Sequence, residues 1–136
     1  VRPNITDEVI NKNIESVEKY GNAITCVSTV ETSIISANGQ DVDEFLDRKK
    51  VYLAKAPQSF KLPDILKAYD KVLATYGTFN VPGLIDSCSV ALSYGMKLKM
   101  IEGNRDNIKV TTPNDYIDIL GRLVSDDYFN FLALKK

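Results

Sequence analysis

Apolar residues recur along the chain at helical spacing in four segments. The first segment begins after Thr6, a good N-cap, and ends at Gly21. Its expected buried face is formed by Ile10, Ile14 and Val17. Three later helices are predicted over residues 63–76, over residues 82–95 and from residue 113 onward. The buried faces expected for them are Ile65, Leu66, Tyr69, Val72, Leu73 and Tyr76, then Ile85, Cys88 and Leu92, and finally Ile117, Leu120 and Val124.

Extended segments alternate with these helices. Residues 23–30 are rich in β-branched side chains and carry no charge, which is typical of a strand buried on both faces of a parallel sheet. Residues 97–101 are a second strand candidate, and Pro57 is expected to stop a strand that precedes it. The alternation of strands and helices predicts an α/β fold over residues 1–136 as a single domain.

Residues 33–54 are predicted to form a protruding β-arm. Its extended pieces are joined by the tight-turn pair Asn38-Gly39 and broken by a charged stretch. Because an isolated hairpin is only marginally stable in water, the arm is expected to pair with the same arm of a second subunit. The basic run Arg48-Lys49-Lys50 has a simpler reading, which is a solvated turn.

The composition narrows the classes of function. A net charge of −1 gives no general attraction to nucleic acid or to anionic membranes. No apolar run approaches the length needed to span a membrane. Cys26 and Cys88 lack metal-ligand spacing and indicate reduced thiols of a cytoplasmic protein, with a surface disulfide as the alternative. The chain contains no histidine, which excludes a histidine general base within it. Phosphoryl and nucleotidyl transfer suit the remaining inventory, because positioning and charge neutralisation do most of the work there.

The segment 102–113 concentrates polar and charged groups between a strand and a helix. Thr112 is a good N-cap, Pro113 suits the first helical position, and Asp115 completes a capping box. Ligands commonly bind where strands end and helices begin in open α/β sheets. Lys109 stands between two apolar residues and would point away from both on an extended chain. Two readings stay open for this segment, a solvated surface loop and a ligand site.

Residues 106–113, Asp-Asn-Ile-Lys-Val-Thr-Thr-Pro, resemble the C-terminal signature of the methylerythritol-phosphate and ribitol-phosphate cytidylyltransferases. The resemblance implies a Rossmann-like nucleotidyltransferase sheet, of which this chain would be the C-terminal part with the N-terminal half absent. It implies an enzyme that uses CTP, a phosphorylated sugar alcohol and Mg²⁺. Smaller motifs follow the family's order, namely Arg2-Pro3, Glu31-Thr32, Asp47-Arg48, Ala56-Pro57-Gln58 and Ile85-Asp86.

The same resemblance implies catalytic roles for Lys109, Thr32 and Arg48. Lys109 would help to neutralise the phosphate of the substrate. Thr32 and Arg48 would reach from the arm into the site of the partner subunit, so the resemblance implies a homodimer.

The implied substrate-binding residues are Arg2, Asp106, Asn107 and Asp86. Arg2 would stand beside a metal-binding aspartate that lies before the start of this chain. Asp106 and Asn107 would border the nucleotide and the metal, and either is a possible metal ligand. Asp86 lies near a helix start, where capping is the commoner use of a carboxylate.

Departures from the family pattern bear on the substrate. Ala56 stands where the family usually has threonine, and Glu31 where it prefers aspartate. The length of the arm and its turn are closer to the ribitol-phosphate enzymes, which favours a polyol phosphate used for cell-surface polymers. Without a glycine-rich nucleotide loop, the 136-residue chain is expected to be inactive by itself. The alternatives are a non-catalytic fragment that dimerises through its arm and an α/β ligand-binding module.

Overall fold

The computed structural model describes residues 1–133 and the side chains of residues 1–125. The chain forms two compact units. The larger unit is Thr6–Asn104, and the smaller unit combines Val1–Ile5 with the chain from Arg105 onward. The single domain expected from the sequence stays a prediction.

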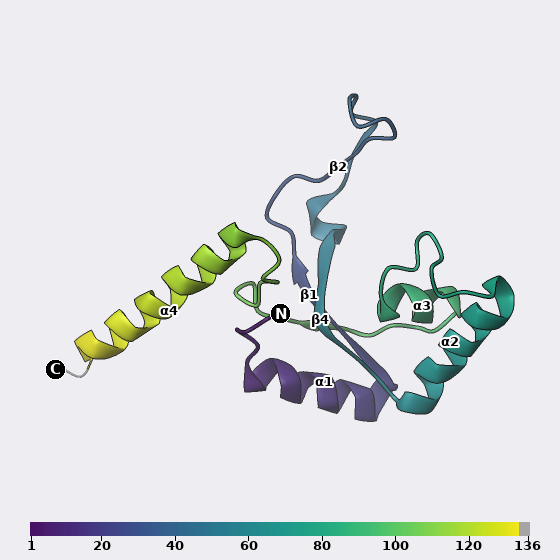
Figure 1. The fold of residues 1–136 in the computed structure, drawn as a ribbon, viewed down its shortest axis with the longest axis horizontal. Helices are drawn as coiled ribbons and strands as arrows, with labels where there is room; N and C mark the ends of the chain where they lie inside the picture. The colour runs from purple at the N-terminus through teal and green to yellow at the C-terminus, as the bar shows by residue number, and fades with distance from the viewer. Residues whose placement is uncertain (134–136) are drawn as a thin grey trace. The chain divides into compact units, whose positions relative to one another are not determined.

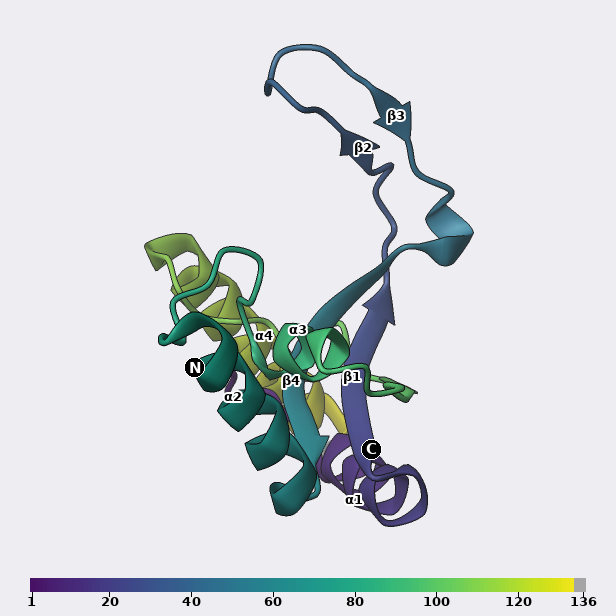
Figure 2. The ribbon, with the colours of Figure 1, turned by 90° about the vertical axis from the view of Figure 1, so that its right-hand side faces the viewer.

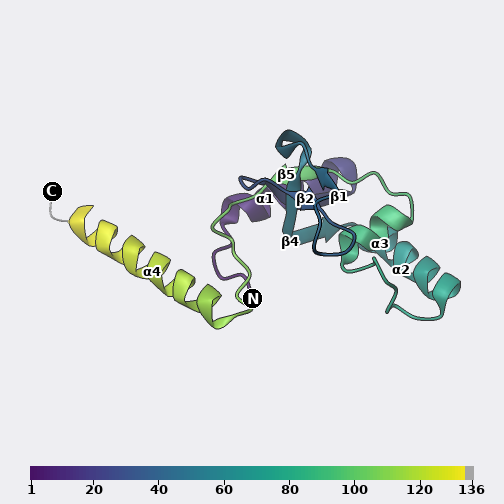
Figure 3. The same ribbon diagram turned by 90° about the horizontal axis from the view of Figure 1, so that it is seen from above.

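The larger unit is built on a three-stranded sheet in the order β4–β1–β5. Figure 1 labels β1 and β4, and Figure 3 labels β5. The central strand β1 (Asn22–Ser28) pairs antiparallel with β4 (Tyr52–Phe60) and parallel with β5 (Met100–Glu102). All of β1 except Ser28 is buried, as its uncharged, β-branched sequence predicts. The parallel pair and the flanking helices confirm the α/β class, although β5 begins and ends later than the predicted strand at 97–101.

Helix α1 (Asp7–Tyr20) begins and ends where the sequence predicts. The hydroxyl of Thr6 accepts a hydrogen bond from the N–H of Val9 at 3.4 Å, which caps the first turn. Gly21 closes the helix in the left-handed conformation, with φ of +85°. The predicted buried face is wrong, however, because Ile10 and Ile14 are 39% and 52% exposed.

The buried face of α1 contains polar residues, which the spacing of apolar residues does not predict to be buried. Asn13 is 2% exposed, and its amide donates to the hydroxyl of Thr25 on β1 at 3.1 Å. The Asn13 carbonyl oxygen accepts from the hydroxyl of Ser59 on β4 at 3.0 Å. Ser16 donates to the backbone carbonyl of Asn22 at 2.8 Å. Buried polar groups are tolerated when they are hydrogen-bonded, and this network ties α1 to two strands.

Strand β4 continues through Pro57 to Phe60, so the predicted strand end at Pro57 is wrong. The pairing with β1 changes register at this point. Ile24 lies opposite Gln58, whereas Cys26 lies opposite Ala54. Such an irregularity lets the strand pass a residue that has no N–H to donate.

Neighbouring side chains of β4 reach helices on opposite faces of the sheet. Ser59 contacts α1, whereas the side-chain oxygen of Gln58 accepts from the N–H of Cys88 in α3 (Ser87–Ser93) at 2.9 Å. Because successive strand residues point to opposite faces, α1 and α3 cover different sides of the sheet.

Helix α2 (Leu62–Tyr76) lies beside α3 (Figure 3). Ala68 and Val72 of α2 meet Val90 of α3 in a small core. The hydroxyl of Tyr69 shares a hydrogen bond of 3.0 Å with Ser87, which agrees with its predicted place in the packed stripe. The predicted stripe is only partly covered, and its exposed members are Leu66, Leu73 and Tyr76.

Helix α3 begins at Ser87 and not at Pro82 as predicted. Its start is set by a capping box, in which the Asp86 carboxylate accepts from the N–H of Ser89 at 2.8 Å and the Ser89 hydroxyl accepts from the N–H of Asp86 at 3.0 Å. The predicted face is also shifted. Val90 and Ala91 are buried, and the exposed residues are Ile85 and Leu92.

The predicted β-arm extends away from the three-stranded sheet (Figure 2). The strands β2 (Ile34–Ile35) and β3 (Glu44–Phe45) pair antiparallel as a separate two-stranded sheet. A short 3₁₀ helix, Arg48–Lys50, follows before β4. The role of the arm in dimerisation stays a prediction.

The tip of the arm closes its own hydrogen bonds. The side-chain oxygen of Asn38 accepts from the N–H groups of Gln40 and Asp41 at 2.9 and 3.0 Å. The N–H of Ala37 donates to the carboxylate of Asp43 at 2.6 Å. The tip therefore holds its shape through local contacts.

The smaller unit carries the long helix α4 (Pro113–Ala133). The predicted capping box is confirmed, since the Asp115 carboxylate accepts from the N–H of Thr112 at 2.7 Å and the N–H of Asp115 donates to the Thr112 hydroxyl at 3.3 Å. The predicted buried face is wrong, because Ile119 is buried and the exposed residues are Ile117, Leu120 and Val124. No helix in residues 1–133 is long and apolar enough to cross a membrane.

Candidate functional site

The signature segment of the smaller unit is held by the first residues of the chain. The N–H of Val110 donates to the carbonyl of Val1 at 2.8 Å. One guanidinium nitrogen of Arg2 donates to the carbonyl of Asn107 at 2.7 Å. Asn107 is 1% exposed, so this part of the segment is buried. Arg2 and Asn107, two predicted substrate-binding residues, are therefore in direct contact.

Lys109 is exposed between half-buried Ile108 and Val110, as the alternation in the sequence predicts. The neighbouring contacts fix the backbone on both sides of it, and its side chain makes no hydrogen bond or ion pair that is visible among the described residues. The segment thus presents an ammonium group from an anchored backbone. Such a group suits recognition of an anion, because little ordering of the chain is needed when the ligand arrives.

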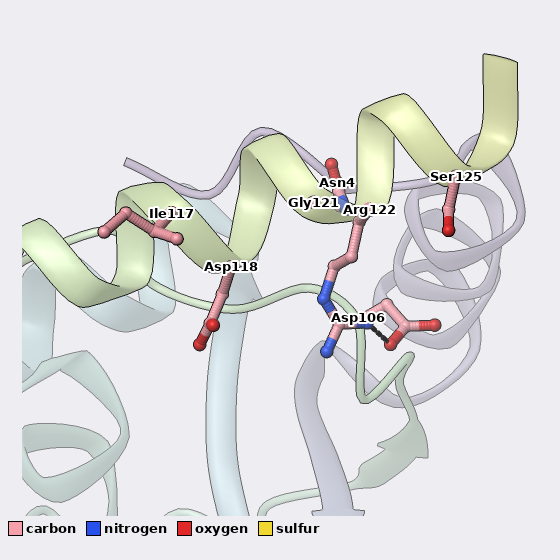
Figure 4. A pocket seen from close by; sticks show the side chains of 7 residues that line it. All are labelled: Asn4, Asp106, Ile117, Asp118, Gly121, Arg122 and Ser125. Atoms are coloured by element: carbon pink, nitrogen blue, oxygen red, sulfur yellow. Dashed lines mark hydrogen bonds and ion pairs between the residues drawn. The ribbon is translucent and has the colours of Figure 1, made fainter. Parts of the chain in front are cut away.

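Asp106 pairs with Arg122 of α4, and both residues line a pocket of about 590 Å³ (Figure 4). Figure 4 shows Asp118 and Arg122 extending from the same side of the helix. The sequence reasoning missed both of these residues. Their spacing of four residues places them on one helix face, which is a signal in the sequence. The same stretch contains Ile117, Leu120 and Val124, whose spacing predicts an apolar face. Asn4 completes the pocket from the N-terminal segment.

Thr32 and Arg48 lie at the arm, in the larger unit. Both are exposed, and a guanidinium nitrogen of Arg48 donates to the carbonyl of Val30 at 3.3 Å. Asp47 caps the 3₁₀ helix by accepting from the N–H of Lys49 at 3.0 Å. The basic run therefore has a defined backbone conformation. That Arg48 and Lys109 act in one site stays a prediction.

Asp86 also belongs to the larger unit, where it has a structural role. Its carboxylate accepts from the side chain of Gln58 at 2.6 Å in addition to the capping bond from Ser89. Burial alone raises the pKa of this carboxyl, but the hydrogen bonds from Gln58, Ser89 and Cys88 outweigh it and the pKa lies below its usual value. A substrate contact for Asp86 stays a prediction.

Cys26 and Cys88 are free thiols. Burial raises the pKa of both, with a further contribution from Cys88 in the case of Cys26 and from Asp86 in the case of Cys88. Both thiols are therefore protonated near neutral pH, which makes them poor nucleophiles.

The described residues do not assemble a complete metal site. Among the side chains of residues 1–125, no group of three or more His, Cys, Asp or Glu is placed to hold a metal ion. The carboxylate of Asp106 is engaged with Arg122. A metal-binding role for Asp106 or Asn107 stays a prediction.

The chain is similar in sequence to known cytidylyltransferases. Residues 1–119 match the family model of 2-C-methyl-D-erythritol 4-phosphate cytidylyltransferase. The ribitol-5-phosphate cytidylyltransferase of Vibrio parahaemolyticus is 44% identical over 116 residues, which are 85% of this chain and 47% of that protein. The corresponding protein of Streptococcus agalactiae serotype V is 40% identical over the same shares. The chain therefore spans about half the length of these relatives.

Solved structures show the same likeness. The 4-diphosphocytidyl-2C-methyl-D-erythritol synthase of Anaerococcus prevotii superposes with a TM-score of 0.78 at 30% identity, covering 90% of this chain and 55% of that one. The 2-C-methyl-D-erythritol 4-phosphate cytidylyltransferase of Thermus thermophilus, at 19% identity and a TM-score of 0.70, covers 85% of this chain and 54% of that one and shows the shared fold.

Proposed function

Because the chain belongs to the 2-C-methyl-D-erythritol 4-phosphate cytidylyltransferase family, we propose that it forms part of a CTP-dependent enzyme that joins a phosphorylated sugar alcohol to CMP. The observation that carries this proposal is the anchored signature segment with Lys109 exposed on it. Its position in the C-terminal part of a longer protein stays a prediction from the sequence. A cytoplasmic location belongs to the same proposal and is supported by the free thiols.

The chemistry fits the residues that the chain offers. A phosphate oxygen of the sugar alcohol attacks the α-phosphorus of CTP, the bond between the α-phosphorus and the bridging oxygen breaks, and pyrophosphate leaves. The nucleophile is already an anion, so no histidine base is required, and the chain has none. Charge repulsion between the two phosphates is the main obstacle, which Lys109 and Arg48 would reduce.

Mg²⁺ is part of the proposal, but the chain's described residues do not complete a site for it. Asp106 would supply at most one carboxylate, and it already pairs with Arg122. We propose that Lys109, Arg48 and Arg2 contact the phosphates and help to orient them.

Ribitol 5-phosphate is the substrate that we propose. The support is the identity of 44% and 40% to two ribitol-5-phosphate cytidylyltransferases, against 30% to the methylerythritol synthase of Anaerococcus prevotii. The length of the arm and its Asn38-Gly39 turn, which resemble those of the ribitol-phosphate enzymes, also favour this substrate.

A chimera tests this proposal. This chain would replace the matched 116 residues of the Vibrio parahaemolyticus relative, and pyrophosphate release would be measured with CTP and each sugar-alcohol phosphate. We expect turnover with ribitol 5-phosphate and little with methylerythritol 4-phosphate, whereas the unfused 136-residue chain should release none. A folded chimera that prefers methylerythritol 4-phosphate would refute the substrate assignment.

Lys109→Ala in the active chimera tests the observation on which the proposal rests. Removing a cation from the phosphate contact should lower kcat/KM by about a hundredfold or more, an estimate based on charged groups that stabilise transition states. The melting temperature should be unchanged because Lys109 is exposed. Lys67→Ala, at an exposed position of α2, is the matched control. Equal kinetics for the two variants would remove Lys109 from the site.

A further inference from the structure

Two lysine ammonium groups converge on one tyrosine ring in the larger unit. The Lys19 nitrogen lies 5.1 Å from the ring centroid of Tyr20, and the Lys99 nitrogen lies 4.8 Å from the same centroid. Lys19 belongs to the last turn of α1, whereas Lys99 directly precedes β5. Residues eighty positions apart in the sequence therefore place their ammonium groups beside the same ring.

Both lysines stand on a rigid backbone. The side chain of Asn22 accepts from the N–H of Lys99 at 2.7 Å and donates to the carbonyl of Lys97 at 3.0 Å. The carbonyl of Lys99 accepts from the N–H of Ile24 at 2.8 Å. These bonds tie the segment before β5 to β1, while Lys19 is fixed by the helix.

Lys19 and Lys99 both line a pocket of about 440 Å³. Lys12, Glu15 and Glu102 also line it, together with Tyr20. Lys12 is already paired with Glu8 at 2.6 Å. No carboxylate in the described residues lies within ion-pair distance of Lys19 or Lys99.

We propose that this pocket binds a small phosphate monoester, with the phosphate between Lys19 and Lys99 and hydroxyl groups of the ligand toward Glu15 and Glu102. Two convergent cations without a carboxylate partner attract a doubly charged anion more strongly than either does alone. The carboxylates on the pocket wall accept hydrogen bonds from hydroxyl groups and repel a second phosphate, so a monoester of a polyhydroxy compound fits better than a nucleoside triphosphate.

The positions of Lys19 and Lys99 could each have a separate structural reason, but these reasons explain the arrangement only in part. Lys19 near the end of α1 interacts favourably with the helix dipole, and lysines near an edge strand discourage aggregation. Neither effect requires the two ammonium groups to share one aromatic ring. This pocket uses no residue assigned to cytidylyl transfer, so it stands or falls independently of the proposed function.

Titration of the isotope-labelled chain with glycerol 3-phosphate at constant ionic strength tests the site by NMR. We expect saturable shifts at the amides of Lys19, Tyr20 and Lys99, and none with glycerol. The double variant Lys19→Met, Lys99→Met should bind about tenfold more weakly or worse, since each lysine contributes a charge-assisted contact. Lys67→Met with Lys71→Met removes the same charge from exposed positions of α2 and serves as the control.

Two outcomes would overturn the proposal. One is an equal loss of affinity for glycerol 3-phosphate in both double variants, which would indicate general charge attraction. The other is a wild-type chain in which saturation shifts other amides and leaves those of Lys19, Tyr20 and Lys99 in place. Because the second outcome is read on the unmodified chain, it does not depend on how well a variant folds.

Discussion

At the scale of the residue, Asp115 shows how much a local signal can fix. Its carboxylate accepts from the N–H groups of Thr111 and Thr112 and from the Thr111 hydroxyl. The backbone bonds from Thr111 and then Thr112 lower the pKa of Asp115 to about 2. Residues within four positions make all of these contacts, which is why the capping box could be predicted from the sequence.

This pKa predicts a pH dependence of stability. Because the folded pKa is lowered, the contribution of Asp115 is fully present above its unfolded pKa of 3.8 and is lost as the pH falls toward about 2. Asp115→Asn should therefore melt at a lower temperature than the wild type at pH 5, and the difference should shrink as the pH falls to about 2. Asp70→Asn removes the same charge at an exposed position of α2 and serves as the control variant.

Gly103 is a residue whose importance depends on a close contact. A Cβ atom at this position would lie 2.4 Å from the Cγ2 methyl of Thr25, which is fully buried. Gly103→Ala should destabilise the fold by about 1–3 kcal/mol, as overpacking of a core typically does. Thr25→Ser removes that methyl and keeps the hydroxyl that accepts from Asn13.

The double variant Gly103→Ala, Thr25→Ser should accordingly be less destabilised than the sum of the single variants, when measured by urea unfolding. Strict additivity would mean that Thr25 is not what excludes a side chain at Gly103.

At the scale of the element, helix existence was easier to predict than helix orientation. Capping residues are local, so the bounds of α1 followed from Thr6 and Gly21. Which face of α1 is buried depends on contacts with β1 and β4. Asn13 makes such contacts through hydrogen bonds with Thr25 and Ser59. A reading based on apolar spacing cannot detect a polar side chain that becomes core through distant hydrogen bonds. The exposed ion pair between Asp106 and Arg122 escaped prediction for another reason, because its members are 16 positions apart and only the fold brings them together.

Asn13→Leu tests this reading of α1. The substitution keeps the number and branching of the side-chain heavy atoms but leaves the hydroxyls of Thr25 and Ser59 without their Asn13 partner. Unfolding in urea should show a loss of about 1–3 kcal/mol, the typical cost of buried groups left unsatisfied. Ile14→Gln, on the half-exposed side, should change stability by less than about 0.5 kcal/mol. A larger loss of stability for Ile14→Gln than for Asn13→Leu would instead support the buried face predicted from the sequence, which contains Ile14.

At the scale of the whole molecule, the predicted site residues are divided between two compact units. Arg2, Asp106, Asn107 and Lys109 belong to the smaller one, and the arm with Arg48 to the larger. The fold class followed from alternating strands and helices, which need no distant information. Assembly of the full site depends on contacts beyond one sequence segment, and in the proposed homodimer the arm would also need a second subunit.

Subunit mixing tests whether Arg48 acts in the partner's site. In the active chimera, Arg48→Ala and Lys109→Ala should each be inactive. Mixed heterodimers should regain up to about half of the wild-type activity, because both lesions then fall in one site and leave the other intact. Mixed dimers that stay inactive, with exchange verified by mass, would place Arg48 in its own subunit's site or in a structural role.

The self-contained hydrogen bonds at the tip of the arm bear on how fast such subunits would exchange. Asn38 and Asp43 hold the tip through bonds within the arm itself. A loop that is already ordered loses little conformational entropy on docking. Encounter between arms would then proceed without a slow folding step, and the lifetime of the dimer would be set by how quickly the docked arms separate.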